Sequence, residues 1–333
     1  MKKVKETGKK QAVKIYLQMF AMLMLLLPTI ISYAQYVKIP DGWFDGYAYV
    51  NGIRVHYYHA KPAPGKPAMV MVHGVTDIGL SWTTLTLKLQ DSYDIYMVDT
   101  RGHGLSDPFT PADNGETLIK DVVDFVHVMK LEKPILMGHS MGAATVMRVG
   151  AEYPDLAKAI IMLDPFVGRR PFRPSPQVRD STHNNQTTPV RQTATSPDHL
   201  SVSMFGNPET LVAQNNYKLE DLFATGRRQF PKWDSLDVYY WAVSKKQYHG
   251  PYTSDEAQAM TGTMNTADAL AKIQVPALIL KADAPPEVRK QNEEAARVMK
   301  NGKLIHIDGA AHNLHHDQLD KTVEVLNDFL KTL

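Results

Sequence analysis

Six short, continuous apolar runs, separated by segments with helical periodicity, constrain the fold of this chain more than any other feature. The runs lie at 68–73, 95–98, 135–137, 159–163, 277–280 and 304–307. Runs of this length that are apolar throughout suit strands covered on both faces, as in a parallel sheet. Apolar residues at helical spacing occur between them, at 116–130, 143–153, 293–300 and 320–333. We therefore expect an α/β fold in which right-handed crossovers place helices on both faces of the sheet.

The segment 47–60 adds two strands at the start of this pattern. Asn51-Gly52 separates them, and this dipeptide favours the positive φ angles of a tight hairpin turn. The predicted fold thus begins with a hairpin.

One long segment, 166–274, interrupts the strand–helix alternation. Its first part, 173–199, is rich in Pro, Ser, Thr, Asn and Gln, which is typical of a loop. The second part predicts helices that carry aromatic residues: Phe223, Phe230, Trp233, Tyr239, Tyr240 and Trp241. We interpret 166–274 as a cap over the carboxyl edge of the sheet, inserted into a core made of 35–165 and 275–333.

The first 34 residues have the pattern of a secretory signal peptide. Six lysines precede an apolar run broken by Pro28, and small residues stand at Ser32 and Ala34. An uncleaved anchor is the alternative, but the run is short for a membrane span, so no stable span is expected after cleavage.

Removing 1–34 changes the net charge from +2 to −3, so nothing predicts nucleic acid as a partner. The chain has no cysteine, which excludes disulfides and lipid-modified cysteine anchors.

The segment PILMGHSMGAA, 134–144, predicts a nucleophile. An apolar strand leads into Gly138-His139-Ser140-Met141-Gly142, and a helix follows. In a G-x-S-x-G motif with this context, the glycines permit a sharp turn that exposes the serine hydroxyl at the top of the sheet. The backbone N–H of Met141 would then face a developing oxyanion. We expect Ser140 to be the nucleophile.

The segment MVHGVTDIGLSW, 71–82, is expected to supply the second oxyanion donor. The N–H just beyond His-Gly belongs to Val75. Thr76, Asp77 and Trp82 are candidates for the pocket wall, or alternatively residues that only hold the loop. His73 and, in the later VDTRGHGLSD loop, His103 are interpreted as structural.

A histidine base is expected after the last strand, in HIDGAAHNLHHD, 306–317. His312 lies in the loop and is the predicted base. His315 and His316 are expected at the start of the terminal helix, exposed to solvent. The cluster that they form with His312 and Asp317 admits a metal site as an alternative, but no other group has a matching spacing, so no metal is expected.

The chain resembles serine hydrolases of the α/β-hydrolase fold over nearly all of 47–333. The resemblance rests on HGVTD, DTRGHGLSD, GHSMG and GAAH in the expected order. More narrowly, HGVTDIGLSW, MLDPF and GAAHNLHHDQ resemble the branch that includes (E)-2-(acetamidomethylene)succinate hydrolase and related esterases. The resemblance implies a mostly parallel eight-stranded sheet flanked by helices, with the cap inserted after the sixth strand.

The resemblance leaves two candidates for the acid that orients the base. In most such hydrolases the acid follows the seventh strand, but Pro285 stands at the expected position and Asp283 comes two residues early. Other members of the fold, including haloalkane dehalogenases, place the acid after the sixth strand, where this chain has Asp164. We predict Asp164, with Asp283 as the alternative.

Together these features predict an exported serine hydrolase that cleaves a small-molecule ester or lactone without a cofactor. An amidase, a C–C bond hydrolase and a non-catalytic ligand-binding member of the fold are the alternatives. Ser140 argues against dehalogenase and epoxide hydrolase chemistry, for which relatives use an aspartate nucleophile. Trp233 and Trp241 are expected in the substrate pocket. Arg169, Arg170 and Arg173 are either binders of a substrate carboxylate or solvated residues at the base of the cap.

Overall fold

The structure, a computed structural model, describes residues 37–167, 200, 202, 208–260 and 264–333. Within it, Pro40–Leu333 forms one compact unit. The predicted signal peptide, 1–34, the predicted loop, 173–199, and the three arginines from 169 to 173 lie outside the described residues. Across the described ranges, no helix is both long and apolar enough to cross a membrane.

An eight-stranded sheet forms the centre of this unit, with the order β1-β2-β4-β3-β5-β6-β7-β8. The two pairs β1–β2 and β2–β4 are antiparallel and all the others are parallel. The prediction of a mostly parallel α/β-hydrolase sheet that begins with a hairpin is confirmed. The strands are β1 (Phe44–Val50), β2 (Ile53–His59), β3 (Ala68–Val72), β4 (Asp94–Val98), β5 (Ile135–His139), β6 (Ala159–Leu163), β7 (Ala277–Lys281) and β8 (Gly302–His306).

Helices cover the sheet in two groups. In one group α3, α4, α9 and α10 contact one another in series, and in the other α2 contacts α12. Strands β3, β5 and β6 lie between these layers and are almost entirely buried, which is why they read as continuous apolar runs. The bounds are α2 (Thr83–Leu89), α3 (Gly115–Val128), α4 (Met141–Glu152), α9 (Thr266–Lys272), α10 (Pro286–Ala296) and α12 (Leu319–Leu330).

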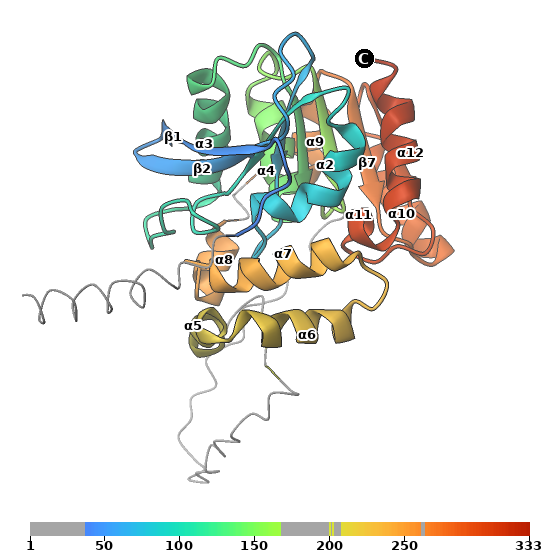
Figure 1. Ribbon diagram of the computed structural model, residues 1–333. Helices are drawn as coiled ribbons and strands as arrows, with labels where there is room; N and C mark the ends of the chain where they lie inside the picture. Colours follow the sequence, from blue (N-terminus) through green and yellow to red (C-terminus); the bar gives the residue numbers. More distant parts are fainter. Residues whose placement is uncertain (1–36, 168–199, 201, 203–207, 261–263) are drawn as a thin grey trace, which may run out of the picture. The chain divides into compact units, whose positions relative to one another are not determined.

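The described part of the inserted segment between β6 and α9 contains four helices: α5 (Pro208–Asn216), α6 (Leu219–Gln229), α7 (Ser235–Lys246) and α8 (Ser254–Ala259). Helices α6 and α7 run side by side, and α7 also contacts α2 and the short 3-10 helix η1 (Gly79–Trp82) that follows β3. Figure 1 shows α6 and α7 as a separate layer below the sheet. A small apolar cluster around Leu222, Val238 and Trp241 holds this layer together.

The end of the expected cap, in contrast, packs as part of the core. Helix α9 lies within 166–274 but contacts α4, and Ala269 and Leu270 are buried in the main hydrophobic cluster. With only seven residues, α9 has too short an apolar pattern to be distinguished in the sequence from the other helices of 166–274. Among the described residues, α9 therefore packs with the helices of the core and not with α6 and α7.

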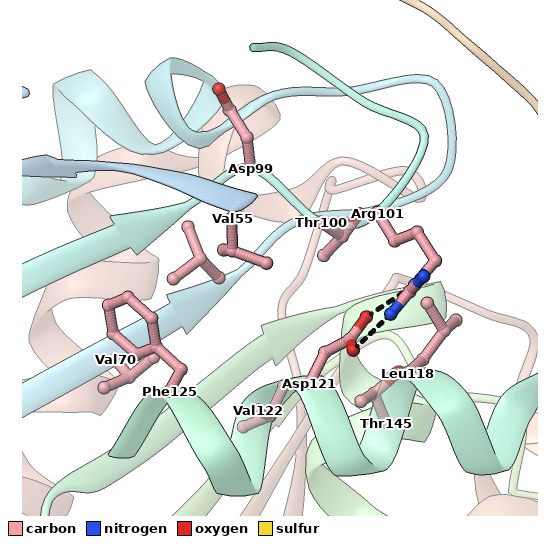
Figure 2. Close-up of a pocket in the computed structure, with 11 residues that line it drawn as sticks. Val55, Val70, Asp99, Thr100, Arg101, Leu118, Asp121, Val122, Phe125 and Thr145 are labelled. Atoms are coloured by element: carbon pink, nitrogen blue, oxygen red, sulfur yellow. Dashed lines mark hydrogen bonds and ion pairs between the residues drawn. The ribbon is translucent and has the colours of Figure 1, made fainter. Parts of the chain in front are cut away.

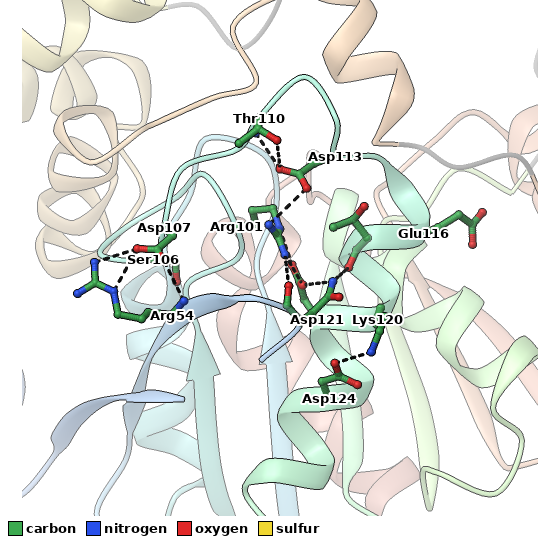
Figure 3. A network of polar contacts seen from close by, with 12 residues as sticks. Arg54, Arg101, Ser106, Asp107, Thr110, Asp113, Glu116, Lys120, Asp121 and Asp124 are labelled. Carbon is green, nitrogen blue, oxygen red and sulfur yellow. Dashed lines mark hydrogen bonds and ion pairs between the residues drawn. The ribbon is translucent and has the colours of Figure 1, made fainter. Parts of the chain in front are cut away.

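The loop after β4 is held by charged contacts rather than by regular structure. The Arg101 guanidinium binds both carboxylate oxygens of Asp121 on α3 and lies 3.3 Å from Asp113, and Arg54 on β2 pairs with Asp107 (Figure 3). Because Arg101 is almost fully buried, these contacts fix the loop firmly. Its conformation matters for the site because His103 projects from it.

Candidate active site

The nucleophile candidate, Ser140, lies at a strained turn between β5 and α4. Its φ is +51° and its ψ is −109°, a conformation that a non-glycine residue holds only when its surroundings force it. The flanking glycines make the turn possible. A Cβ on Gly138 would lie 2.2 Å from the carbonyl oxygen of Gly142, and one on Gly142 would lie 2.0 Å from that of Val72. The G-x-S-x-G motif therefore forms the sharp strand–turn–helix geometry that its sequence predicted.

Asp164 is the carboxylate beside the base candidate, His312. The Nδ1 atom of His312 lies 2.6 Å from Oδ2 of Asp164, which directly follows β6. The other oxygen, Oδ1, accepts the backbone N–H of Ala282 at 3.1 Å and lies 2.5 Å from the ammonium of Lys281. Burial alone would raise the pKa of Asp164. The hydrogen bond with His312 and the charge on Lys281 outweigh burial and lower this pKa to about 2, so Asp164 is ionised at neutral pH.

Asp283, the alternative acid, lies elsewhere and shapes a loop. Its carboxylate accepts the backbone N–H of Gly309 at 2.8 Å and pairs with Arg289, while its own N–H donates to Ala310 O. Its side chain is 42% exposed. Pro285, at the usual position of the acid in the fold, is the N-cap residue of α10. Asp283 therefore braces the turn that leads to His312 without contacting the imidazole.

The candidate oxyanion donors, Val75 and Met141, line one cavity together with Ser140. Met141 is the first residue of α4, where a backbone N–H has no partner within the helix. The next residue after Val75, Thr76, has a φ of +61°, and its N–H donates to Nε2 of His103 at 3.1 Å. His103 is fully buried. It thus braces the turn beside Val75, in keeping with its interpretation as structural.

Two cavities meet at Ser140. One, of about 330 Å³, lies toward α8 and is lined by Asp164, Phe166, Ala257, Met260 and Lys281. The other, of about 370 Å³, lies toward α6 and α7 and is lined by Asp77, Phe230, Trp233, Trp241 and Lys245. Ser140, His312 and Val75 belong to both linings. A substrate with a group on each side of its reacting carbon would fit this arrangement.

Four of the five predicted pocket residues line the second cavity: Thr76, Asp77, Trp233 and Trp241. Trp82 does not line this cavity, and its position fits the alternative that it holds the loop. Its side chain is 1% exposed, and its ring stacks on His315 with centroids 4.7 Å apart. Trp82 sits in η1, which packs into the layer between α7 and the sheet, so its indole faces inward.

His315 and His316 are buried, which contradicts the expected exposure. They lie in the short helix α11 (Leu314–Asp317), 2% and 8% exposed. Burial lowers the pKa of His315 well below its usual value, and His316 Nδ1 lies 3.0 Å from Asp237 of α7. In the part of the chain that the structure describes, no group of three or more His, Asp and Glu side chains is arranged to hold a metal ion.

Three residues near the site were not singled out in the sequence: His139, Lys245 and Lys281. His139 Nε2 lies 2.9 Å from the carbonyl oxygen of His312. Lys281 pairs with Asp164, and Lys245 is buried beside Thr76. His139 occupies a variable position of the motif and Lys281 ends β7, so proximity to the motif and to a strand end could have indicated them.

The cap is tied to the loop that carries His312. Trp233 Nε1–H donates to Oδ1 of Asp317 at 2.7 Å, and Oδ2 of Asp317 accepts the N–H of Ala311 at 2.9 Å. Trp233 also stacks on Phe230 with ring centroids 3.9 Å apart. One carboxylate thus joins the cap to the residue before His312.

A third cavity lies inside the core and is not part of the site. It has a volume of about 20 Å³, room for about one water molecule, and is walled by side chains such as Val55, Val70 and Phe125 (Figure 2). The Arg101–Asp121 pair closes one side. Neither Ser140 nor His312 lines it, so this cavity offers no place for a substrate.

A model of the alpha/beta hydrolase family matches residues 69–325. Epoxide hydrolase 1 of Caenorhabditis elegans is 22% identical over 88% of this chain and 72% of its own length. The 2-(acetamidomethylene)succinate hydrolase of Mesorhizobium japonicum is 32% identical over 29% of this chain and 35% of its own length, which confirms the narrower resemblance. Among solved structures, an N-formylmaleamic acid deformylase from Pseudomonas putida has a TM-score of 0.63 and 19% identity, covering 85% of this chain and all of its own.

Proposed function

Since this chain belongs to the alpha/beta hydrolase family, we propose that it is a serine hydrolase that cleaves a carboxylic ester or lactone. The observation that carries the proposal is the contact of 2.6 Å between His312 Nδ1 and Asp164 Oδ2, in a cavity that Ser140 also lines. A carboxylate on Nδ1 leaves Nε2 free to accept a proton and stabilises the imidazolium that results. Because Asp164 is ionised, it can do both.

The proposed reaction has two halves. In the first, Ser140 Oγ attacks the carbonyl carbon while His312 Nε2 takes the hydroxyl proton. The N–H groups of Met141 and Val75 stabilise the oxyanion, and His312 then protonates the leaving alkoxide. In the second half, His312 takes a proton from water, hydroxide attacks the acyl-enzyme, and Ser140 regains its proton as the acid leaves. These steps need no cofactor.

An ester or lactone is favoured over an amide because an alkoxide leaves more easily than an amine. Amide and C–C bond cleavage use the same groups and are the chemical alternatives. The serine at the nucleophile position favours acyl transfer over epoxide opening, even though an epoxide hydrolase is among the relatives. A non-catalytic ligand-binding role is the alternative from a different class.

The experiment is to label the purified protein with a fluorophosphonate probe and to assay 4-nitrophenyl esters from acetate to decanoate. We expect rapid labelling and ester turnover, and loss of both in Ser140→Ala with an unchanged melting temperature. Labelling without ester turnover would redirect the search to amide and C–C substrates. A folded protein that does not react with the probe would point to the ligand-binding alternative.

We also propose that the protein is exported with residues 1–34 removed, because the order of basic, apolar and small residues there fits a cleavable signal. Amino-terminal sequencing of protein from the cell envelope or the medium should start at Gln35. A protein that starts at Met1 and stays with the membrane fraction would favour the uncleaved anchor instead.

A further inference from the structure

The side chain of Lys245 is an unusual component of the cavity beside Ser140. It projects from α7 and is 2% exposed. Its Nζ donates to the carbonyl oxygen and to the hydroxyl oxygen of Thr76, each at 2.9 Å, and lies 5.2 Å from the ring centroid of Trp241. All of these partners are uncharged.

The positive charge of Lys245 is therefore not neutralised by a neighbouring anion. Among the residues that the structure describes, no carboxylate lies within 4.0 Å of Nζ. Burial lowers the pKa of Lys245 to about 8, which the more distant charge of Asp77 only partly opposes. A buried cation without a close counter-ion is destabilising, and this one lines the same cavity as the candidate nucleophile, Ser140.

Lys245 is also part of a cavity wall. It lines the cavity of about 370 Å³ that contains Ser140 and His312. An ammonium group has three N–H donors, and Thr76 accepts two of them. One donor and the full charge are thus available to a ligand in a cavity whose other walls include Phe230, Trp233 and Trp241.

We propose that Lys245 recognises an anionic group, a single carboxylate, on the part of the substrate that occupies this cavity. The inference rests on the proposed function, because it assumes that Ser140 acts on that substrate. A carboxylate fits better than a phosphate, since one lysine offers one charge and Asp77 on the same wall would repel a dianion. The substrate class is then a half-ester of a dicarboxylic acid or an ester that carries a carboxylate on its alcohol part.

The test compares matched esters. Mono-4-nitrophenyl glutarate and 4-nitrophenyl pentanoate differ mainly by a carboxylate on the acyl side, and 4-acetoxybenzoate and phenyl acetate differ by one on the alcohol side. In the wild-type protein we expect kcat/KM to favour the anionic member of at least one pair. In Lys245→Met this ratio should fall by about 10- to 100-fold, as for the loss of a hydrogen bond to a charged group, whereas Lys245→Arg should retain most of it.

Two control variants separate recognition from loop support. Thr76→Val removes the hydroxyl that binds Lys245 but leaves the charge, so the preference for the anion should persist. Asp77→Asn removes the repelling carboxylate, so the preference should rise. If Lys245→Met lowers kcat/KM for both members of a pair by the same factor, Lys245 only holds the Thr76 turn and the proposal is overturned.

A binding measurement keeps this test separate from the proposed function. Titration of glutarate into Ser140→Ala by calorimetry should show binding that Lys245→Met in the same background weakens by at least about 10-fold. Failure of the proposed function would instead give no fluorophosphonate labelling and no turnover of any ester, anionic or neutral. Turnover of the neutral and anionic esters at equal rates by the wild-type protein, with no glutarate binding, would overturn the carboxylate proposal alone.

Discussion

The Nε2 atom of His139 lies 2.9 Å from the carbonyl oxygen of His312. His139 directly precedes the candidate nucleophile, so one hydrogen bond joins the turn of Ser140 to the backbone of the candidate base. Burial and the proximity of His312 lower the pKa of His139 to about 4. The ring is therefore neutral at neutral pH, and its Nε2–H donates to the carbonyl. This contact ties the backbone of His312 to the residue that precedes Ser140.

Replacing His139 should therefore affect catalysis more than binding. His139→Leu removes the donor, and we expect kcat to fall by about 10-fold, a loss typical of one hydrogen bond, with little change in KM. His139→Gln offers an amide N–H near the same place and should retain most of the activity. Steady-state kinetics with one 4-nitrophenyl ester, together with melting temperatures, check this. Equal losses in the two variants at equal stability would contradict a role for the hydrogen bond.

The two candidate acids should differ sharply in their effect on turnover. Asp164→Asn keeps the size of the side chain but removes the negative charge beside His312 Nδ1, and the amide can trap the wrong tautomer of the His312 imidazole. A loss on the order of 10,000-fold in kcat is expected, as for the same change in serine proteases. Asp283→Asn should cost far less, since Asp283 contacts Gly309 and Arg289. Single-turnover rates of fluorophosphonate labelling provide a second readout, and the reverse ranking would assign the role to Asp283.

Asp164 should also make the free energy of unfolding depend on pH in the acidic range. Its pKa is about 2 in the folded protein against 3.8 when unperturbed, so its ionised form favours folding above about pH 4. This contribution, about 2 kcal/mol, disappears as the pH falls from about 5 to about 2. Urea unfolding across this range should show a steeper loss of stability for the wild-type protein than for Asp164→Asn. Parallel curves would mean that the pKa of Asp164 is not lowered.

The two cap tryptophans should have separable roles. Trp233→Phe keeps an aromatic ring to stack on Phe230 but loses the hydrogen bond to Asp317, so all esters should slow by a similar factor as the His312 loop loosens. Trp241→Ala enlarges the cavity toward α7 and should change the ranking among ester chain lengths. A panel from acetate to decanoate measures both. An unchanged ranking in Trp241→Ala would make Trp241 an ordinary packing residue of the cap.

The sheet and the turn at Ser140 were predictable because their signals are local. A buried strand must be apolar along its whole length, and a glycine at 138 or 142 is required where the backbone leaves no space for a Cβ. The prediction of Asp164 rested on the resemblance to members of the fold that place the acid after the sixth strand. The sheet edge alone did not choose between Asp164 and Asp283, because the parallel strands β6, β7 and β8 all end there. Asp164 remains a predicted acid until its variant is assayed.

The residues that escaped prediction depend on contacts between distant segments. His315 and His316 lie at the start of a helix, where exposure is usual, but α7 of the cap covers them, as the contact of His316 with Asp237 illustrates. Lys245 is adjacent to Lys246 in a helix with acidic and basic residues, and this pattern is typical of lysines exposed to solvent. Only the packing of α7 on the turn at Thr76 makes it a buried cation.

The pairing of His312 with Asp164 joins positions 148 residues apart. Between them the chain enters the cap, returns through α9 and adds two further strands. Closing so large a loop is among the slow events of folding, so the pair assembles only when β6, β7 and β8 have aligned. Reactivity of Ser140 is consequently a reporter of completed assembly: in a refolding experiment it should recover after the far-UV circular dichroism signal that marks the earlier, more local formation of helices.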